Sequence, residues 1–205
     1  MKAMAGASVV DLAFGLRGSL LPEDHGLALC RAVAQVLPWL AQVQNAGIHR
    51  VKGASNGEGE LLLSHRAELT LRLPERCVDD ASKLAGRRIE IGAREFLVEA
   101  CRVRRLLPAK TLYAARVVTV SGEEVEFADA IAGELLAHGV ACETVIGMRH
   151  RVATPEGTIS GYSVMLYGLQ PEQSLRMQER GLGRYRPLGC GLFMRHRSPG
   201  PGSDA

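Results

Sequence analysis

The chain has 205 residues, a hydrophobic content of 46% and a formal net charge of +3, values typical of a globular protein with one large or two smaller domains. No segment reaches the ~18 apolar residues of a membrane span, and the first residues lack the unbroken apolar stretch of a secretion signal, so we expect a cytoplasmic protein. The five cysteines form no C-x-x-C pair and no zinc-binding spacing, which indicates reduced, buried thiols rather than a disulfide framework or a metal site.

The first half of the chain predicts strands and helices in the order β-α-β-β-α-β. Apolar residues alternate over residues 10–16, which favours a half-buried strand, and they recur every three or four residues over 27–37, which favours an amphipathic helix. The segments 60–64 and 67–73 are expected to form a pair of strands. A second helix between Pro74 and Gly86 and a strand over 94–106 complete this order.

The second half repeats the same order of elements. A capping box of Ser121 and Glu124 is expected at the start of its first helix, and Pro171 and Gly181 are expected to begin and end its second. The predicted elements, in chain order, are a strand over 111–120, a helix over 121–139, strands over 143–152 and 158–169, a helix over 171–181 and a strand over 190–196.

This repetition predicts an α+β fold of two tandem ferredoxin-like domains. We expect the first domain over residues 1–107, the second over 108–197, and a disordered tail over 198–205. The alternative is one mixed α+β domain in which the repetition is accidental.

A basic, glycine-rich segment lies near the C-terminus. Residues 176–197 hold six arginines and one acidic residue, a charge of +5, so the rest of the chain sums to about −2. Such a local excess points to a phosphate or an anionic polymer as partner, although a solvated surface loop would have the same composition. A dinucleotide site is disfavoured, because that motif joins a strand to a following helix, whereas this segment follows a helix and precedes a strand.

The same segment, "GLGRYRPLGCGLF", resembles the glycine-rich loop of the RAMP superfamily, the RNA-binding proteins of CRISPR systems. "LPEDHGLALCRAVAQVLP", "GIHRVKG" and "GLQPEQSLRMQERGLG" resemble the Cas6 family of repeat-processing endoribonucleases, in particular its Myxan subtype. The resemblance implies a metal-independent enzyme without a cofactor that cuts CRISPR repeat RNA at one phosphodiester. It also implies an enzyme that stays on the repeat hairpin as a subunit of a larger CRISPR complex.

Metal-free RNA cleavage needs a base for the 2′-OH, an acid for the departing 5′-oxygen and cations for the phosphate, and histidine suits both proton transfers. The expected product carries a 2′,3′-cyclic phosphate. The resemblance places a catalytic histidine after the first helix, which selects His49, with Lys52 as the phosphate stabiliser. His25 is the rival, because another branch of the family keeps its histidine at the start of that helix. Each histidine has a structural alternative, as a cap or a loop contact.

The glycines of the basic segment are expected to let main-chain N–H groups approach RNA phosphates, while its arginines supply charge. Arginines that alternate on a strand are expected to face a duplex stem, whose backbone and shape proteins read with few aromatic residues. The predicted RNA-binding residues are Arg50, Arg149, Arg151, Arg180, Gly181, Gly183, Arg184, Tyr185, Arg186, Gly189 and Gly191. A non-catalytic RNA-binding scaffold subunit of a CRISPR ribonucleoprotein complex is the alternative function.

Overall fold

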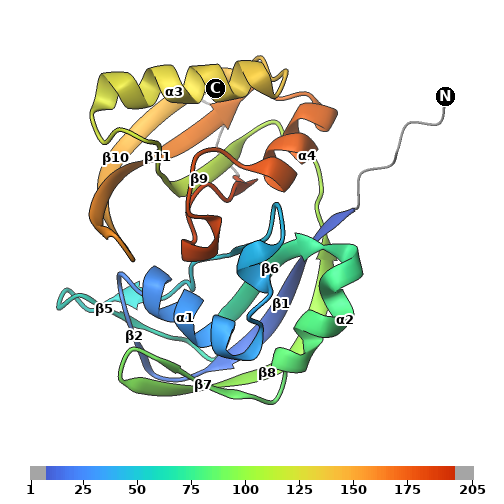
Figure 1. The fold of residues 1–205 in the computed structure, drawn as a ribbon, viewed down its shortest axis with the longest axis vertical. Helices are drawn as coiled ribbons and strands as arrows, with labels where there is room; N and C mark the ends of the chain where they lie inside the picture. The colour runs from blue at the N-terminus through green and yellow to red at the C-terminus, as the bar shows by residue number, and fades with distance from the viewer. Residues whose placement is uncertain (1–7, 197–205) are drawn as a thin grey trace, which may run out of the picture. The chain divides into compact units, whose positions relative to one another are not determined.

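A computed structural model describes residues 8–196 of the chain, so the tail predicted to be disordered lies outside the described residues. The chain divides into two compact units (Figure 1). Of the described residues, the first unit contains 8–106 and the two later segments Val152–Thr158 and Tyr185–Gly189. The second unit contains Leu107–Arg151, Ile159–Arg184 and residues 190–196.

The first unit contains a five-stranded antiparallel sheet in the order β3-β6-β1-β8-β7. Helix α1 follows β1 and helix α2 follows β6, so the order without β7 is that of a ferredoxin-like fold. These elements are β1 (Val9–Arg17), α1 (Gly26–Val36), β3 (Gly47–Ile48), β6 (Glu68–Pro74), α2 (Val78–Ala81), β7 (Arg88–Ile91) and β8 (Arg94–Arg105). A second, three-stranded sheet is formed by β2 (Leu20–Pro22), β5 (Glu60–Leu62) and β4 (Ala54–Ser55).

The second unit has a four-stranded sheet in the order β10-β11-β9-β12. Numbered within their own unit, these are the second, third, first and fourth strands, which is also the order of β3, β6, β1 and β8 in the first unit. Its elements are β9 (Leu112–Val117), α3 (Glu124–Ala137), β10 (Glu143–Thr154), β11 (Gly157–Tyr167), α4 (Pro171–Arg180) and β12 (Met194–Arg195). The chain therefore has the predicted α+β fold with two ferredoxin-like halves.

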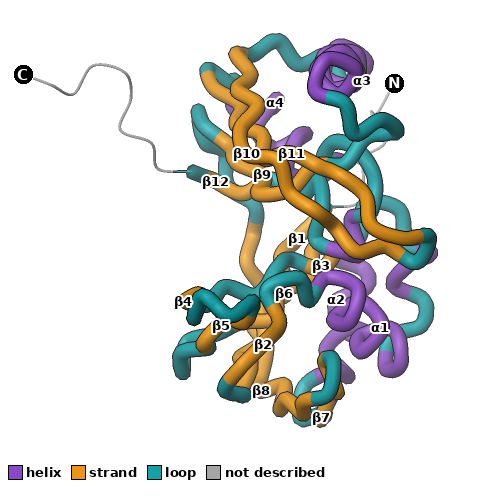
Figure 2. The backbone as a smooth tube through the Cα atoms, turned by 90° about the vertical axis from the view of Figure 1, so that its left-hand side faces the viewer, coloured by secondary structure: helices purple, strands orange, loops and turns teal. Residues whose placement is uncertain are grey.

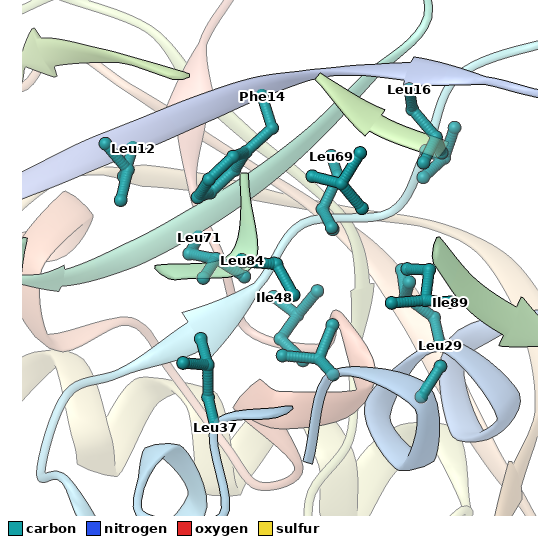
Figure 3. Packing of buried hydrophobic residues seen from close by; sticks show 14 of the residues in the cluster. Leu12, Phe14, Leu16, Leu29, Leu37, Ile48, Leu69, Leu71, Leu84 and Ile89 are labelled. Carbon is teal, nitrogen blue, oxygen red and sulfur yellow. The ribbon is translucent and has the colours of Figure 1, made fainter. Parts of the chain in front are cut away.

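The two faces of the first sheet carry different side chains. Leu12 and Phe14 of β1 and Leu71 of β6 are buried against the helices, with Leu29 of α1 in the same cluster (Figure 3). Helices α1 and α2 lie on one side of this sheet (Figure 2). Because side chains alternate along a strand, the neighbours of Leu12 in β1 point to the opposite face of the sheet, and Asp11 is one of these neighbours. A polar site on the sheet therefore belongs to the face without helices.

The predicted pairing of residues 60–64 with 67–73 is wrong. Strand β5 pairs with β2 and β4, whereas β6 pairs with β1 and with β3. The missed strand β3 has only two residues, too few for a period-two pattern to be recognised. Its position matters because His49 follows it directly.

The predicted capping box at the start of α3 is also wrong. The Ser121 hydroxyl accepts a hydrogen bond from the Glu123 amide at 3.2 Å, and α3 begins after Glu123 without a side-chain cap. A capping box forms instead at α4, between Gln170 and Gln173. The five cysteines are all free, but only Cys190 is fully buried. None of the helices in residues 8–196 is long and apolar enough to cross a bilayer.

Candidate functional site

His49 lies in the first unit, immediately after β3. Its main-chain amide donates to the Thr70 carbonyl at 2.8 Å and so extends the pairing of β3 with β6 by one residue. Gly47, two residues earlier, lies opposite Arg72 of β6. Because side chains two apart on a strand share a face, this register brings His49 and Arg72 to the same face of the sheet.

Asp11 of β1 lies opposite Arg72 on the other side of β6. Arg72 donates from Nε to Asp11 Oδ1 at 2.8 Å and from Nη2 to Oδ2 at 2.9 Å, a bidentate pair. The Arg72 side chain is 1% exposed and that of Asp11 is 18% exposed. Nε2 of His49 lies 3.4 Å from the same Oδ1 atom, in ion-pair range but longer than an ordinary hydrogen bond.

Arg186 belongs to a short 3₁₀ turn, Arg186–Leu188, within the glycine-rich segment. Its Nη2 donates to the Asn45 carbonyl at 2.8 Å. Burial, followed by repulsion from Arg72, lowers its pKa to about 10, although Asp11 opposes that shift. Four charged or titratable groups from distant parts of the sequence therefore meet here, and we call them the Asp11 cluster: Asp11, His49, Arg72 and Arg186.

The protonation states of this cluster follow from its surroundings. Burial alone would raise the pKa of Asp11, but the nearby His49 ring and the hydrogen bonds and charge of Arg72 hold it well below its usual range. Burial lowers the pKa of His49, and the repulsion of Arg72 and Arg186 adds to this effect, against the opposing influence of Asp11. At neutral pH the cluster thus holds one carboxylate, two guanidinium groups and a neutral imidazole, a net charge of +1. The imidazole can accept a proton, and the excess positive charge favours an anion.

His25 is placed very differently, although it lies in the same unit. The residue is 0% exposed. Its Nδ1 lies 2.8 Å from the Pro22 carbonyl oxygen, and its Nε2 accepts a hydrogen bond from the Val51 amide at 3.1 Å. With both ring nitrogens bonded to main chain, the imidazole links the start of α1 to the loop that carries His49.

The other two residues predicted near His49 also differ in placement. Arg50 is partly buried, donates from Nη2 to the Glu23 carbonyl at 2.5 Å and approaches Asp24 at 3.8 Å. It therefore tethers the loop before α1. Lys52 is exposed and is accessible to a ligand.

The glycine-rich segment does not offer the main-chain donors that we predicted. The four glycine amides all donate within the chain: Gly181 to Met177 O at 2.9 Å, Gly183 to Glu134 Oε2 at 2.8 Å, Gly189 to Arg186 O at 3.0 Å, and Gly191 to Arg116 O at 2.7 Å. All four have positive φ angles between 66° and 84°. A Cβ atom on Gly183 would lie 2.3 Å from Val118 O, and one on Gly191 would lie 2.0 Å from Leu182 O. Glycine is required here for backbone conformation and close packing.

The remaining predicted RNA-binding side chains lie mostly on the surface. Arg180 and Arg184 are exposed, as are Arg149 and Arg151 on β10. The Tyr185 hydroxyl lies 3.4 Å from Glu156, and its φ of 65° is rare for a residue other than glycine.

Sequence reasoning missed Asp11 and Arg72. Both occupy polar positions in segments that were predicted as strands, over residues 10–16 and 67–73. The sequence therefore showed a charged residue on the non-core face of each strand. It did not show that β1 and β6 are paired in the sheet. Arg186 is the predicted RNA-binding residue that joins His49 in the Asp11 cluster.

Comparison with known proteins agrees with this fold. Residues 10–198 match the sequence model of the family described as Cas6 Crispr. The chain is 35% identical over 187 residues to the CRISPR-associated endonuclease Cas6 of Myxococcus xanthus, covering 90% of this chain and 80% of that protein.

Solved structures give similar results at low sequence identity. A CRISPR associated protein Cas6 matches with a TM-score of 0.64 at 11% identity, covering 92% of this chain and 100% of the other. A Cas6-related protein from Pyrococcus furiosus matches with a TM-score of 0.59 at 13% identity, covering 91% and 98%. Thermus thermophilus Cse3, solved with an RNA representing a pre-cleavage complex, matches with a TM-score of 0.51 at 15% identity, covering 91% and 98%. The sequence match over nearly the whole described chain and the shared fold together show that this chain belongs to the Cas6 family.

Proposed function

We propose that the chain is a site-specific endoribonuclease that cuts CRISPR repeat RNA at one phosphodiester without a metal ion. The observation that carries this proposal is a neutral, nearly buried His49 inside a cluster of net positive charge. Family membership supports CRISPR RNA as the class of substrate, since the Myxococcus relative is named a CRISPR-associated endonuclease.

His49 would remove the proton from the ribose 2′-OH. The 2′-oxygen then attacks the adjacent phosphorus, a 2′,3′-cyclic phosphate forms and the bond from phosphorus to the 5′-oxygen breaks. The departing 5′-oxygen needs a proton, which the newly formed imidazolium of His49 can return. Because its pKa is lowered, His49 is neutral before the reaction and readily gives the proton back.

Positive charge near His49 would stabilise the phosphate as negative charge grows in the transition state. Arg186 contributes to the excess charge of the cluster, and exposed Lys52 lies three residues after His49. His25 would support this site indirectly, because its Nε2 atom accepts a hydrogen bond from the amide of Val51, which lies between His49 and Lys52 in the chain.

Exposed arginines on β10 and at the end of α4 would grip the repeat hairpin through its backbone. Such contacts do not depend on the cut, so the product hairpin would remain bound. A protein that keeps its product can serve as a subunit of a larger CRISPR complex, with other CRISPR-associated proteins as partners.

The test uses purified protein with its cognate repeat RNA in EDTA, beside the same RNA carrying a 2′-deoxy nucleotide at the scissile position. We expect one cut in the first RNA, a product ending in a 2′,3′-cyclic phosphate, and no cut in the second. Cutting of the deoxy RNA would contradict 2′-OH attack, and dependence on added metal would contradict metal independence. Tight binding without any cut of either RNA would favour the scaffold function.

A further inference from the structure

We propose that Asp11 is a positioning residue for His49: its carboxylate holds the proton of the neutral imidazole on Nε2, so that Nδ1 is the nitrogen that receives the 2′-OH proton. The inference rests on the proposed function and names the residue that orients its base.

The geometry assigns this role to one oxygen atom. Asp11 Oδ1 already accepts a hydrogen bond from Arg72 Nε at 2.8 Å and lies 3.4 Å from His49 Nε2. Nε2 is buried and has no hydrogen-bond partner among residues 8–196. A movement of a few tenths of an ångström would complete a hydrogen bond, and such contacts often tighten only when substrate binds.

The chemistry of the pair fixes which nitrogen carries the proton. A carboxylate accepts hydrogen bonds and cannot donate one, so an unprotonated Nε2 lone pair facing Asp11 would be repelled. The bidentate contact with Arg72 keeps the carboxylate ionised and fixes its plane. Asp11 thus favours the Nε2–H tautomer, as an acidic partner does for a catalytic histidine elsewhere.

Every charged group that faces His49 acts in a defined direction. Asp11 on β1 raises the pKa of His49, whereas Arg72 on β6 and Arg186 in the glycine-rich segment lower it, in addition to burial. Removal of the Asp11 charge would therefore lower the pKa of His49 further and remove the tautomer preference at the same time.

The first measurement needs no change at Asp11. In ¹⁵N-labelled wild-type protein without RNA, long-range ¹H–¹⁵N spectra report the tautomer of each of the six histidines, and His49→Gln assigns the signal. We expect neutral His49 with its proton on Nε2 at pH 7. A proton on Nδ1, or a charged ring at that pH, would overturn the inference even if the enzyme cuts RNA as proposed.

The second measurement compares Asp11→Asn with wild type. We expect the plateau rate of single-turnover cleavage to fall about 10- to 100-fold, as for loss of other residues that orient a histidine, and the acid limb of the pH–rate profile to move to lower pH. A merely structural role would lower the rate without moving that limb.

Glu68→Gln is the matched control, because Glu68 is a carboxylate on the same sheet that pairs with Arg104 and Arg102. We expect this variant to keep the tautomer of His49 and the acid limb. If wild type has the expected tautomer but cuts no RNA, the proposed function fails and the positioning contact stands. If Asp11→Asn does not fold, the wild-type spectrum still decides the tautomer.

Discussion

Two buried histidines of the first unit, at the start of α1 and after β3, show how differently the same side chain can be used. The two ring nitrogens of His25 contact main-chain groups, the Pro22 carbonyl and the Val51 amide. His49 meets the Asp11 carboxylate and faces two guanidinium groups. Both are nearly inaccessible, so burial alone does not distinguish them.

The difference teaches that the type of partner, rather than exposure, distinguishes these two histidines. A ring bonded to fixed main-chain groups cannot change its protonation without breaking a buried hydrogen bond. A ring that faces charged side chains can gain or lose a proton, because those charges favour one or the other protonation state. The predictions below test this contrast.

Replacing His49, the proposed base, should have the largest effect. We expect His49→Ala to reduce single-turnover cleavage of the repeat RNA by about 10²- to 10⁴-fold, because the base is lost, while RNA affinity in a filter-binding assay stays close to wild type. His65→Ala, at an exposed histidine, is the control. Cleavage retained by His49→Ala would remove this residue from the mechanism.

Replacing the structural ring should instead reduce stability. We expect His25→Ala to lower the free energy of unfolding by about 2–4 kcal/mol, because the Pro22 carbonyl and the Val51 amide lose their buried partner. Urea denaturation measures this loss, and the folded protein should still cut RNA. A variant of normal stability that no longer cuts would reverse the contrast and make His25 the catalytic residue.

The glycine-rich segment, like His25, has its main-chain hydrogen bonds within the chain, so it is expected to contribute to stability. Gly183→Ala should destabilise the protein by about 1–3 kcal/mol, because the residue has a φ of 71° and its Cβ would lie 2.3 Å from Val118 O. Gly57→Ala is the matched control, with a φ of 79° and open space around its Cβ. Thermal unfolding of both variants measures the two losses of stability. The loss in Gly57→Ala reflects backbone strain alone, so the additional loss in Gly183→Ala reflects the steric clash. Equal losses would contradict the packing role.

The pH dependence of stability should show the smallest effect. The pKa of His49 is lower in the folded protein than the unfolded value of about 6.5, so the unfolded chain binds more protons below that pH. The free energy of unfolding should therefore decrease as pH falls from about 7 to 5, by at most about 1.4 kcal/mol per pH unit for this group. Urea titrations across this range should give a smaller slope for His49→Gln. An unchanged slope would mean that burial does not shift this ring.

Much of the fold could be read from the sequence because long elements repeat their pattern. The alternation in β1, the proline that begins α4 and the glycine that ends it were all recognised. Strand β3 was missed because a strand of two residues is too short to show an alternating pattern. The capping box of α3 was predicted wrongly because the Ser121 hydroxyl accepts from the Glu123 amide, which lies before the first residue of the helix.

The candidate site was only partly visible. His49 was selected through its loop motif, and that selection remains a prediction until the variants are measured. Asp11 and Arg72 stand 61 residues apart in the chain and become partners only through the register of β1 with β6. The glycines were recognised as special, but their amides are used inside the fold and not at a ligand.

The sequence by itself determined most of the long helices and strands of both halves and their apolar faces, because these depend on local periodicity. Only the tertiary structure decided which histidine is tied to main chain and which meets a carboxylate. That outcome depends on strand order and register, which bring together side chains that no local pattern connects.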